Sequence, residues 1–356
     1  MSVTKPLMRA LAGERQAIPP IWLMRQAGRY LPEYREIRQS VGNFLDLCFN
    51  PKLAAEVTLQ PIRRFGFDAA IMFSDILVIP HALGQRVSFS KGDGPRLDAI
   101  TDAVGLRKLR ELDQGRLDAV YETIRRVKQQ LPDNVALLGF CGAPWTLATY
   151  MIAGSGSSDQ IPAREFAYRS PDLLDALIEK LVRASADYLI RQFEAGADAV
   201  QIFDTWAGVL SSDEFDRCCI DPCARIVAAV HKRIPAAKII GFPRGAGSKL
   251  QRYISAVAVD AVGLDWTIDP AFARDKLQTR KPIQGNLDPV ALLAGGQALD
   301  GAVDHILQNF AAGPFIFNLG HGVLPDTPVR HARDQLELLH VPLRCGVGII
   351  DFELHH

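Results

Sequence analysis

Short runs of apolar residues recur along the chain, and each run ends at polar residues or glycine. The runs span residues 21–24, 69–73, 136–140, 199–203, 238–242, 261–264, 281–285 and 315–319. Between them lie segments whose apolar residues recur every three or four positions, as in an amphipathic helix. The longest, residues 171–196, ends at Gly196, a residue type that commonly terminates helices. Continuous apolar strands that alternate with helices predict a parallel sheet covered on both faces.

Eight strands of this kind favour a single distorted (β/α)8 barrel of the TIM type over an open α/β sheet. Long insertions after the first two runs predict the distortion, and no Pro/Gly/Ser-rich linker divides the 356 residues. We therefore expect one barrel domain across residues 1–356. The pattern leaves open the roles of an N-terminal segment, 1–17, and a C-terminal tail, 343–356. In such barrels the active site lies at the carboxyl ends of the strands.

The residues that directly follow the runs are therefore candidates for a functional site. They are Arg25, Ser74, Asp75, Cys141, Asp204, Thr205, Arg244, Asp265, Asn286 and His321. Tyr150 lies on a predicted helix that opens at Pro144, close to the end of the third run. The set combines acids, arginines and one histidine without a metal-ligand cluster. It predicts a site for an organic polyanion.

Composition and charge narrow the classes of function. Forty basic residues balance forty acidic ones, so no overall electrostatic field attracts nucleic acid or a membrane surface. The hydrophobic and charged fractions, 48% and 22%, are typical of a soluble enzyme. The sequence shows neither a secretory signal nor an apolar run of about 18 residues, which predicts a cytoplasmic protein.

The six cysteines predict reduced thiols rather than a disulfide framework, because no secretory signal precedes them. Cys218, Cys219 and Cys223 lack the Cys-x-x-Cys spacing of a structural metal site, and no histidine stands nearby in ligand register. We expect buried or helical thiols there, and no metal.

Each candidate residue also has an ordinary structural interpretation. Arg25 and Arg29 either clamp other parts of the chain or await an anion; Gly28 between them allows close backbone approach and favours the anion. Asp75 is equally typical of a helix N-cap and of a functional carboxylate. Taken singly, these residues predict only an anion site.

The same alternatives hold for the remaining candidates. Tyr150 on an apolar helix is by default a core residue with a locally bonded hydroxyl, and Thr205 equally fits a turn bonded to its own backbone. His321 stands between two glycines at the end of a predicted strand, which favours an exposed, functional imidazole.

Taken as strings, the same residues resemble one family. The segments WLMRQAGRYLPEYR, FSDIL, GAPWTLATYM, DTWAG and NLGHGVLPDTP, in this order, are similar to motifs of the uroporphyrinogen decarboxylase family of haem biosynthesis. The resemblance extends from about residue 18 to about residue 327. It implies a homodimer of single distorted barrels that converts uroporphyrinogen III to coproporphyrinogen III. The reaction removes CO₂ from four acetate side chains without a metal or organic cofactor.

The resemblance also assigns roles to residues. It implies that substrate is bound by Arg25, Gln26, Ala27, Gly28, Arg29, Asp75, Tyr150, Thr205 and His321. Catalytic roles fall to Asp75, Arg25, Arg29 and His321, with Asp75 as the central acid. Some members carry serine where this chain has Thr205, which keeps the hydroxyl. The proton donor stays open, because the high pKa of arginine makes Arg25 a poor acid, whereas His321 or a bound water fits the neutral range better.

Two other functions are compatible with such a barrel. A corrinoid-linked methyltransferase of the same superfamily typically holds zinc through a His-x-Cys pair and a distant cysteine, and this sequence contains no His-x-Cys pair. A non-catalytic tetrapyrrole carrier would bind the macrocycle and leave its side chains intact.

Overall fold

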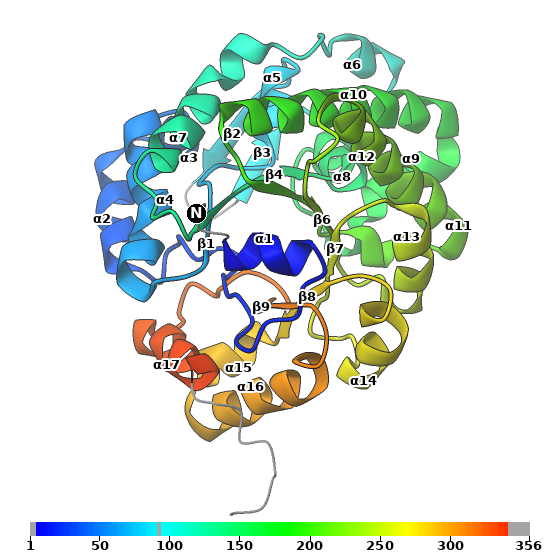
Figure 1. Ribbon diagram of the computed structural model, residues 1–356. Helices are drawn as coiled ribbons and strands as arrows, with labels where there is room; N and C mark the ends of the chain where they lie inside the picture. Colours follow the sequence, from blue (N-terminus) through cyan, green and yellow to red (C-terminus); the bar gives the residue numbers. More distant parts are fainter. Residues whose placement is uncertain (1–4, 91–93, 341–356) are drawn as a thin grey trace, which may run out of the picture.

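The computed structural model describes residues 5–90 and 94–340, and a curled parallel sheet surrounded by helices forms its centre (Figure 1). The strands lie in the order β1–β4–β5–β6–β7–β8–β9. They are β1 (Ala69–Ile71), β4 (Ala136–Gly142), β5 (Ala199–Asp204), β6 (Ile239–Pro243), β7 (Ala261–Gly263), β8 (Ile283–Leu287) and β9 (Phe315–Leu319). Seven of the eight predicted strands are therefore confirmed.

The first apolar run differs from the prediction, because residues 21–24 form an isolated bridge rather than a strand. Ile21 pairs in parallel with Phe317 of β9, and the Ile21 carbonyl accepts a hydrogen bond of 2.9 Å from the Asp68 amide, next to β1. The run thus lies between the two edge strands of the sheet. Pro19 and Pro20 before the run lack backbone N–H donors, and a turn begins at Met24, so too few residues remain for a regular ladder.

Helices cover the outside of the sheet (Figure 1). The predicted helix over 171–196 is α10 (Pro171–Ala195), which ends at Gly196 with φ +117°. The other principal helices are α2 (Pro32–Ser40), α4 (Pro51–Phe65), α7 (Asp118–Lys128), α8 (Pro144–Ala153), α9 (Ile161–Arg169), α12 (Asp221–Arg233), α13 (Leu250–Ala256), α14 (Pro270–Ala273), α15 (Pro289–Ala294), α16 (Gly296–Phe310) and α17 (Val329–His340). None of the helices in the described ranges combines the length and apolar character needed to cross a bilayer.

Two insertions precede β4, as the long spacings predicted. Between the first run and β1 lie α2, α3 (Phe44–Cys48) and α4. Between β1 and β4 lie α5 (Val78–Ala82), a hairpin of β2 (Val87–Ser90) and β3 (Gly94–Leu97), α6 (Ala103–Arg107) and α7. The predicted tail, 343–356, lies outside the described residues.

Alternate residues of the strands face the interior of the curled sheet, as the two-residue period of a strand requires. Several strands begin with alanine, which leaves space at the amino ends: Ala69, Ala136, Ala199 and Ala261 are all buried there. The helix α1 (Pro6–Leu11) fills this space with Leu7, Ala10 and Leu11, and Figure 1 shows it lying across the middle of the strands. Part of the N-terminal segment thus closes the amino end of the sheet.

The helix α1, which plugs the amino end, is held by a partly buried ion pair as well as by packing. Lys5, which precedes α1, donates a hydrogen bond of 2.7 Å to Asp198, and Lys128 of α7 donates one of 2.6 Å to the same carboxylate. The Leu137 amide also donates to Asp198, at 2.7 Å. Because both ammonium groups and an amide stabilise the charged carboxylate, they lower the pKa of Asp198 against the opposing effect of burial.

Truncation of the plug tests its contribution to stability. Leu7 is fully buried against the strand starts, so Leu7→Ala should lower the free energy of unfolding by about 2–5 kcal/mol through lost burial and a residual cavity. Arg9→Ala on the same helix removes only an exposed ion pair with Glu14 and should cost about 1 kcal/mol or less. Urea denaturation measures both. Equal, small losses for the two variants would contradict the plug.

Candidate active site

The turn after the first apolar run presents Arg25 in a conformation that L-residues rarely adopt. Arg25 has φ +59°, in the left-handed region, which costs about 1–3 kcal/mol and persists only when the surroundings impose it. The neighbouring Gln26 imposes it. Its fully buried side chain accepts a hydrogen bond of 3.0 Å from the Leu23 amide and donates one of 3.1 Å to the Ala69 carbonyl of β1.

Gln26 therefore positions the turn, and it was predicted to bind substrate. Its main chain is also occupied, because its amide donates to the Leu23 carbonyl and its carbonyl accepts from the Tyr30 hydroxyl at 2.8 Å. A direct contact between the Gln26 side chain and a ligand would require these bonds to break. The three residues that follow differ from Gln26 in that their backbone amides are unbonded to any described residue. Within the described ranges, the backbone amides of Ala27, Gly28 and Arg29 donate no hydrogen bond.

Gly28 favours the turn itself. A Cβ at Gly28 would lie 3.1 Å from the Arg25 carbonyl oxygen, tighter than most Cβ contacts, so a larger residue would move the chain away from Arg25. The predicted close approach at Gly28 is thus made by the protein's own backbone. The result is a short loop with exposed guanidinium groups at Arg25 and Arg29 and a row of unbonded amides, a combination suited to anions.

Asp75 lies opposite this loop, just beyond β1. One carboxylate oxygen accepts a hydrogen bond of 2.8 Å from the Leu77 amide, so the carboxylate does stabilise the turn before α5. The N-cap of α5 itself is Leu77, and Asp75 is not the cap. Burial raises the pKa of Asp75, and the Leu77 amide and the positive charge of Arg25 oppose this rise. The two interpretations of Asp75 are therefore compatible, since one oxygen serves the turn and the side chain also interacts with Arg25.

Tyr150 belongs to the same group. It lies on α8, which begins at Pro144 as predicted, and burial raises its pKa while the charge of Asp75 raises it further and that of Arg25 lowers it. Among the described residues, the side chain of Trp206 is the hydrogen-bond partner of the Tyr150 hydroxyl, and it opposes the rise in pKa. Thr205, after β5, is half-buried, and its hydroxyl makes no turn bond to the residues the structure describes.

His321 follows β9, and the glycine after it, Gly322, lies against Arg25. A Cβ at Gly322 would lie 2.3 Å from Cδ of Arg25, and a Cβ at Gly320 would lie 2.3 Å from the Trp266 amide nitrogen. The two glycines therefore let the Trp266 backbone and the Arg25 side chain approach the chain on either side of His321. Burial lowers the pKa of His321 to about 3, with further contributions from the charges of Arg25 and Arg244. At neutral pH His321 is uncharged in the ligand-free protein.

Arg25 is the centre of this arrangement. Its charge acts on Asp75, Tyr150, His321 and Arg244, which come from four different parts of the chain. Arg29 is exposed on the same turn, and its charge acts on Tyr34 of α2 instead. The structure thus brings Arg25, Asp75, Tyr150 and His321 together and places Arg29 at the outer side of the group.

A row of phenyl rings forms an apolar surface in the interior beneath these groups. Phe140, Phe203 and Phe242 are inward-facing residues near the ends of β4, β5 and β6. Their rings meet edge to face, with centroid distances of 5.7 Å and 6.0 Å. Gly263 of β7 makes room for this row, because a Cβ there would lie 2.6 Å from the Phe242 ring. An apolar surface of this kind suits the face of a large ring-shaped ligand.

The structure also brings together residues that the sequence kept apart. Potential metal-ligand atoms of Asp204, Cys219 and Cys223 lie within 4.8 Å of one another in the core. The spacing of the cysteines along the sequence could not show that a carboxylate lies beside them. Asp204 accepts a hydrogen bond of 2.6 Å from the Thr146 hydroxyl. Burial raises the pKa of Cys219 well above its ordinary value, which keeps it a thiol, whereas metals bind the thiolate. The predicted buried thiols are confirmed for Cys218, Cys219 and Cys223.

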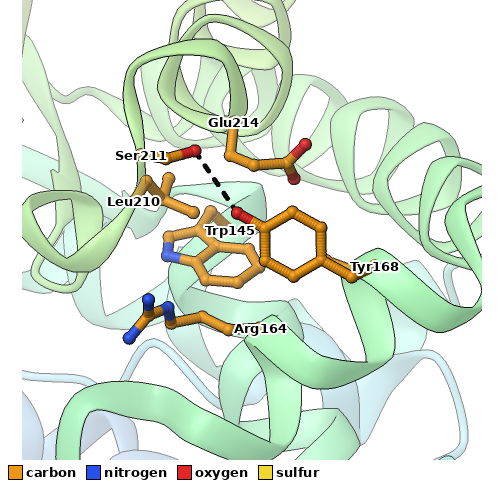
Figure 2. Close-up of a pocket in the computed structure, with 7 residues that line it drawn as sticks. Trp145, Arg164, Tyr168, Leu210, Ser211 and Glu214 are labelled. Carbon is orange, nitrogen blue, oxygen red and sulfur yellow. Dashed lines mark hydrogen bonds between the residues drawn. The ribbon is translucent and has the colours of Figure 1, made fainter.

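A surface pocket seen in Figure 2 lies elsewhere. It is lined by Trp145, Tyr168, Ser211 and Glu214, among others, from α8, α9 and the segment around α11 (Ser212–Phe215). The Tyr168 and Ser211 hydroxyls lie 3.4 Å apart across it. None of the predicted site residues lines this pocket, so it is separate from the group around Arg25.

Comparisons with known proteins identify the family of the chain. The family model of uroporphyrinogen decarboxylase (URO-D) matches residues 3–341. The uroporphyrinogen decarboxylase of Chelativorans sp. (strain BNC1) is 56% identical over 335 residues, which cover 94% of this chain and 97% of the relative. That of Agrobacterium fabrum is 58% identical over 322 residues, covering 90% and 93%. The chain belongs to the uroporphyrinogen decarboxylase family.

Solved structures add the fold. A methyltransferase from Methanosarcina mazei superposes with a TM-score of 0.79 at 19% sequence identity, covering 95% of this chain and 98% of the other. A B12-independent methionine synthase from Shewanella sp. W3-18-1 gives a TM-score of 0.53 at 11% identity, covering 90% and 95%. At these identities the likeness concerns the α/β fold alone.

The buried Asp204 makes a prediction about stability and pH. Burial raises the pKa of Asp204 to about 6, above the ordinary value of 3.8, and Thr146 and Cys219 only partly oppose this. The stability that the neutral acid provides is complete below pH 3.8 and is lost as the pH rises to 6, a change of about 3 kcal/mol. Asp204→Asn cannot ionise and still accepts from Thr146.

Asp204→Asn should therefore gain stability relative to the parent, by up to about 3 kcal/mol, as the pH rises from 4 to 7. Urea denaturation at several pH values measures the difference. Asp213→Asn, at an exposed position on α11, is the control and should show no such trend. Parallel pH profiles for Asp204→Asn and the parent would contradict a buried neutral acid.

Proposed function

We propose that this protein decarboxylates the four acetate side chains of uroporphyrinogen III and releases coproporphyrinogen III and four CO₂, without a metal or organic cofactor. The observation that carries the proposal is the strained turn at Arg25. It holds a guanidinium and unbonded amides opposite the buried carboxylate of Asp75, above a phenyl surface. A polycarboxylate macrocycle requires these features together, because it is anionic at its edge, apolar on its faces and rich in N–H donors at its centre.

The chemistry explains why no cofactor is needed. A carboxylate that leaves as CO₂ leaves an electron pair behind, and most decarboxylases use a cofactor to accept it. Protonation of a pyrrole ring carbon turns the pyrrole into a cation conjugated with its acetate arm, so the substrate itself accepts the electrons. What the protein must supply is stabilisation of that cation.

Asp75 is the group that we assign to this stabilisation. An ionised carboxylate near the centre of the macrocycle accepts hydrogen bonds from the pyrrole N–H groups and attracts the developing positive charge. Burial raises the pKa of Asp75 in the free protein. Hydrogen bonds from the substrate favour the charged form, so binding itself prepares the carboxylate for its role.

Arg25 and the free amides of Ala27, Gly28 and Arg29 bind carboxylates of the substrate. A bidentate guanidinium contact fixes the register of the macrocycle, with each charge-assisted hydrogen bond contributing about 1.5–3 kcal/mol. Binding of this kind is useful on carboxylates that do not react, since an arginine on the reacting acetate would stabilise the anion and slow CO₂ loss. The Tyr150 hydroxyl, which Trp206 also contacts, and the half-buried Thr205 hydroxyl supply further hydrogen bonds.

His321 acts in this scheme as a neutral hydrogen-bonding group. With a pKa of about 3 it carries no proton to give at neutral pH in the free protein. Substrate carboxylates placed beside it would raise the pKa, so His321 becomes a proton donor only in the complex. A water molecule held by Arg25 is the other donor that fits the chemistry.

The proposal extends to the architecture. Residues 20–24 complete the sheet as the eighth member of a (β/α)8 barrel, supported by hydrogen bonds from both edges: the Phe317 amide donates to the Pro20 carbonyl, and the Asp68 amide to the Ile21 carbonyl, each at 2.9 Å. One barrel domain spans the chain and works as a homodimer in the cytoplasm, as the family resemblance implies.

The test is an anaerobic incubation of the purified protein with uroporphyrinogen III and no additives, followed by chromatography of the porphyrins. We expect four equivalents of CO₂ and a product with four carboxylates. Asp75→Asn keeps the size and an oxygen for the Leu77 amide but removes the charge, so it should fold normally and lose about 100-fold or more in turnover. Circular dichroism checks the fold.

Three outcomes would contradict the proposal. Uroporphyrinogen recovered intact after tight binding would indicate a carrier, and a requirement for zinc and a methyl donor would indicate a methyltransferase. Parental turnover by Asp75→Asn would limit Asp75 to its role in the turn.

Arg25→Lys tests planar recognition at the turn. Lysine retains the positive charge but loses the guanidinium fork, so kcat/KM for uroporphyrinogen should fall about 10-fold or more. Arg107→Lys, an exposed substitution on α6, serves as the matched control and should leave kcat/KM unchanged. Steady-state kinetics compare the two. Full activity of Arg25→Lys would rule out bidentate carboxylate binding there.

A further inference from the structure

A second guanidinium lies in the candidate cleft, which is the group of side chains around Arg25 at the carboxyl end of the sheet. Arg244 directly follows β6, and its backbone amide donates a hydrogen bond of 3.1 Å to the Asp204 carbonyl at the end of β5. Its side chain is half-buried, and its charge acts on both Arg25 and His321. Burial lowers the pKa of Arg244, and the charge of Arg25 lowers it further. The protein thus places two arginines near each other although like charges repel.

The hydrogen-bonding capacity of Arg244 is almost unused. Its single side-chain hydrogen bond among the described residues is a contact of 3.5 Å from Nη1 to the Thr205 carbonyl. Asp265 attracts it, but that carboxylate accepts a hydrogen bond of 2.7 Å from the Gly245 amide and further ones from the Thr267 amide and hydroxyl. Most of the five guanidinium N–H groups are therefore free to bind another anion.

An aromatic ring fixes the direction of this side chain. The guanidinium carbon of Arg244 lies 5.1 Å from the centre of the Trp266 ring, within the range of a cation–π interaction. Trp266 is 37% exposed, which is unusual for a residue of this size. Its backbone is confined by β9, because Gly320 leaves no space for a Cβ beside the Trp266 amide. Trp266 is thus a rigid, open platform that holds Arg244.

The loop that carries Arg244 is equally fixed. Gly245 has φ +73°, and a Cβ at Gly208 would lie 2.8 Å from the Gly245 carbonyl oxygen, so the loops after β5 and β6 pack backbone against backbone. The glycines after β6 serve this packing, and the Gly245 amide is bonded to Asp265. The feature that remains available to a ligand is the guanidinium.

The contacts of the two glycines and of Trp266 bring both arginines near His321. Arg25 lies against Gly322, Arg244 lies over the Trp266 ring, and the Trp266 backbone lies against Gly320. The charges of both arginines act on His321. Two positive groups near one imidazole are suited to a ligand that carries more than one carboxylate.

We propose, on the basis of the function proposed above, that Arg244 held on Trp266 is a second carboxylate-binding position of the cleft. It takes a side-chain carboxylate of the tetrapyrrole that does not react while Arg25 holds another. A contact to a carboxylate that stays ionised throughout stabilises the bound substrate and the transition state equally. Such a residue lowers KM and leaves kcat nearly unchanged.

Steady-state decarboxylation of uroporphyrinogen by Arg244→Gln tests this position. Loss of a charge-assisted hydrogen bond corresponds to a KM about 10-fold or more above the parent, with kcat within about two-fold. The affinity for oxidised uroporphyrin, measured by quenching of its fluorescence, should fall in parallel. Arg244→Lys restores the charge and should recover part of the loss. Trp266→Leu leaves the arginine but removes its platform, so KM should rise about 2- to 5-fold.

Arg252→Gln on α13 is the matched control. Arg252 is an exposed arginine paired with Asp216 at 2.8 Å, so its loss changes the net charge equally without touching the cleft. We expect its KM to be that of the parent. An Arg244→Gln protein with unchanged KM, or with reduced kcat at unchanged KM, would overturn the proposal, as would equal effects of the Arg252 control.

The design separates this proposal from the function on which it rests. If the unsubstituted protein releases no CO₂ from uroporphyrinogen, the proposed function fails. If it does release CO₂ and Arg244→Gln shows parental KM and uroporphyrin affinity, only the second carboxylate position fails. Should Arg244→Gln not fold, Trp266→Leu decides, and a parental KM for that variant would contradict the proposal.

Discussion

The candidate site depends on holding the Arg25 guanidinium at the end of a buried segment, where no carboxylate of residues 5–90 and 94–340 is bonded to it. That requires a residue in the left-handed region, anchored by the fully buried Gln26 between Leu23 and Ala69. Two such side-chain hydrogen bonds contribute about 1 kcal/mol each, the same order as the backbone strain that they offset. The turn is thus prepared for a ligand before the ligand arrives, and little ordering is left for the binding step.

The rest of the fold isolates this charge at one end of the sheet. The helix α1 closes the amino end with Leu7 and Leu11, and alanines at the strand starts make the space for it. The phenyl row of Phe140, Phe203 and Phe242 stands between that plug and the polar groups above. The apolar surface below lowers the local dielectric, which strengthens the attraction between Asp75 and a developing cation.

Much of this arrangement could be predicted from the sequence. Seven of the apolar runs form strands because parallel strands are buried on both faces, and the helix that ends at Gly196 ends there because glycine readily takes φ +117°. The positions after the runs identified Arg25, Asp75 and His321, since parallel strands deliver their carboxyl ends to one side. The first run was predicted to be a strand but forms an isolated bridge. Its pairing with the two sheet edges depends on partners far away in the chain.

Properties that arise from contacts between distant residues could not be predicted. Gln26 was expected to bind substrate, and only the structure shows that its side chain is bonded to β1. His321 was considered for its neutral titration range, yet burial beside two arginines lowers its pKa to about 3. The approach of Asp204 to Cys219 depends on a π-helical turn, Asp216–Ile220, that no spacing rule foresees. Arg244 stood among the residues after the runs, but its platform, Trp266, did not.

The central claim is that Asp75 receives the pyrrole N–H groups while arginines hold the carboxylates. A crystal structure of the complex with coproporphyrinogen, grown anaerobically, tests it most directly. The account predicts pyrrole nitrogens within about 3.2 Å of the Asp75 carboxylate, with the macrocycle above the phenyl row and a propionate at Arg25. A macrocycle bound with its nitrogens turned away from Asp75, or outside the cleft around Arg25, would contradict the account.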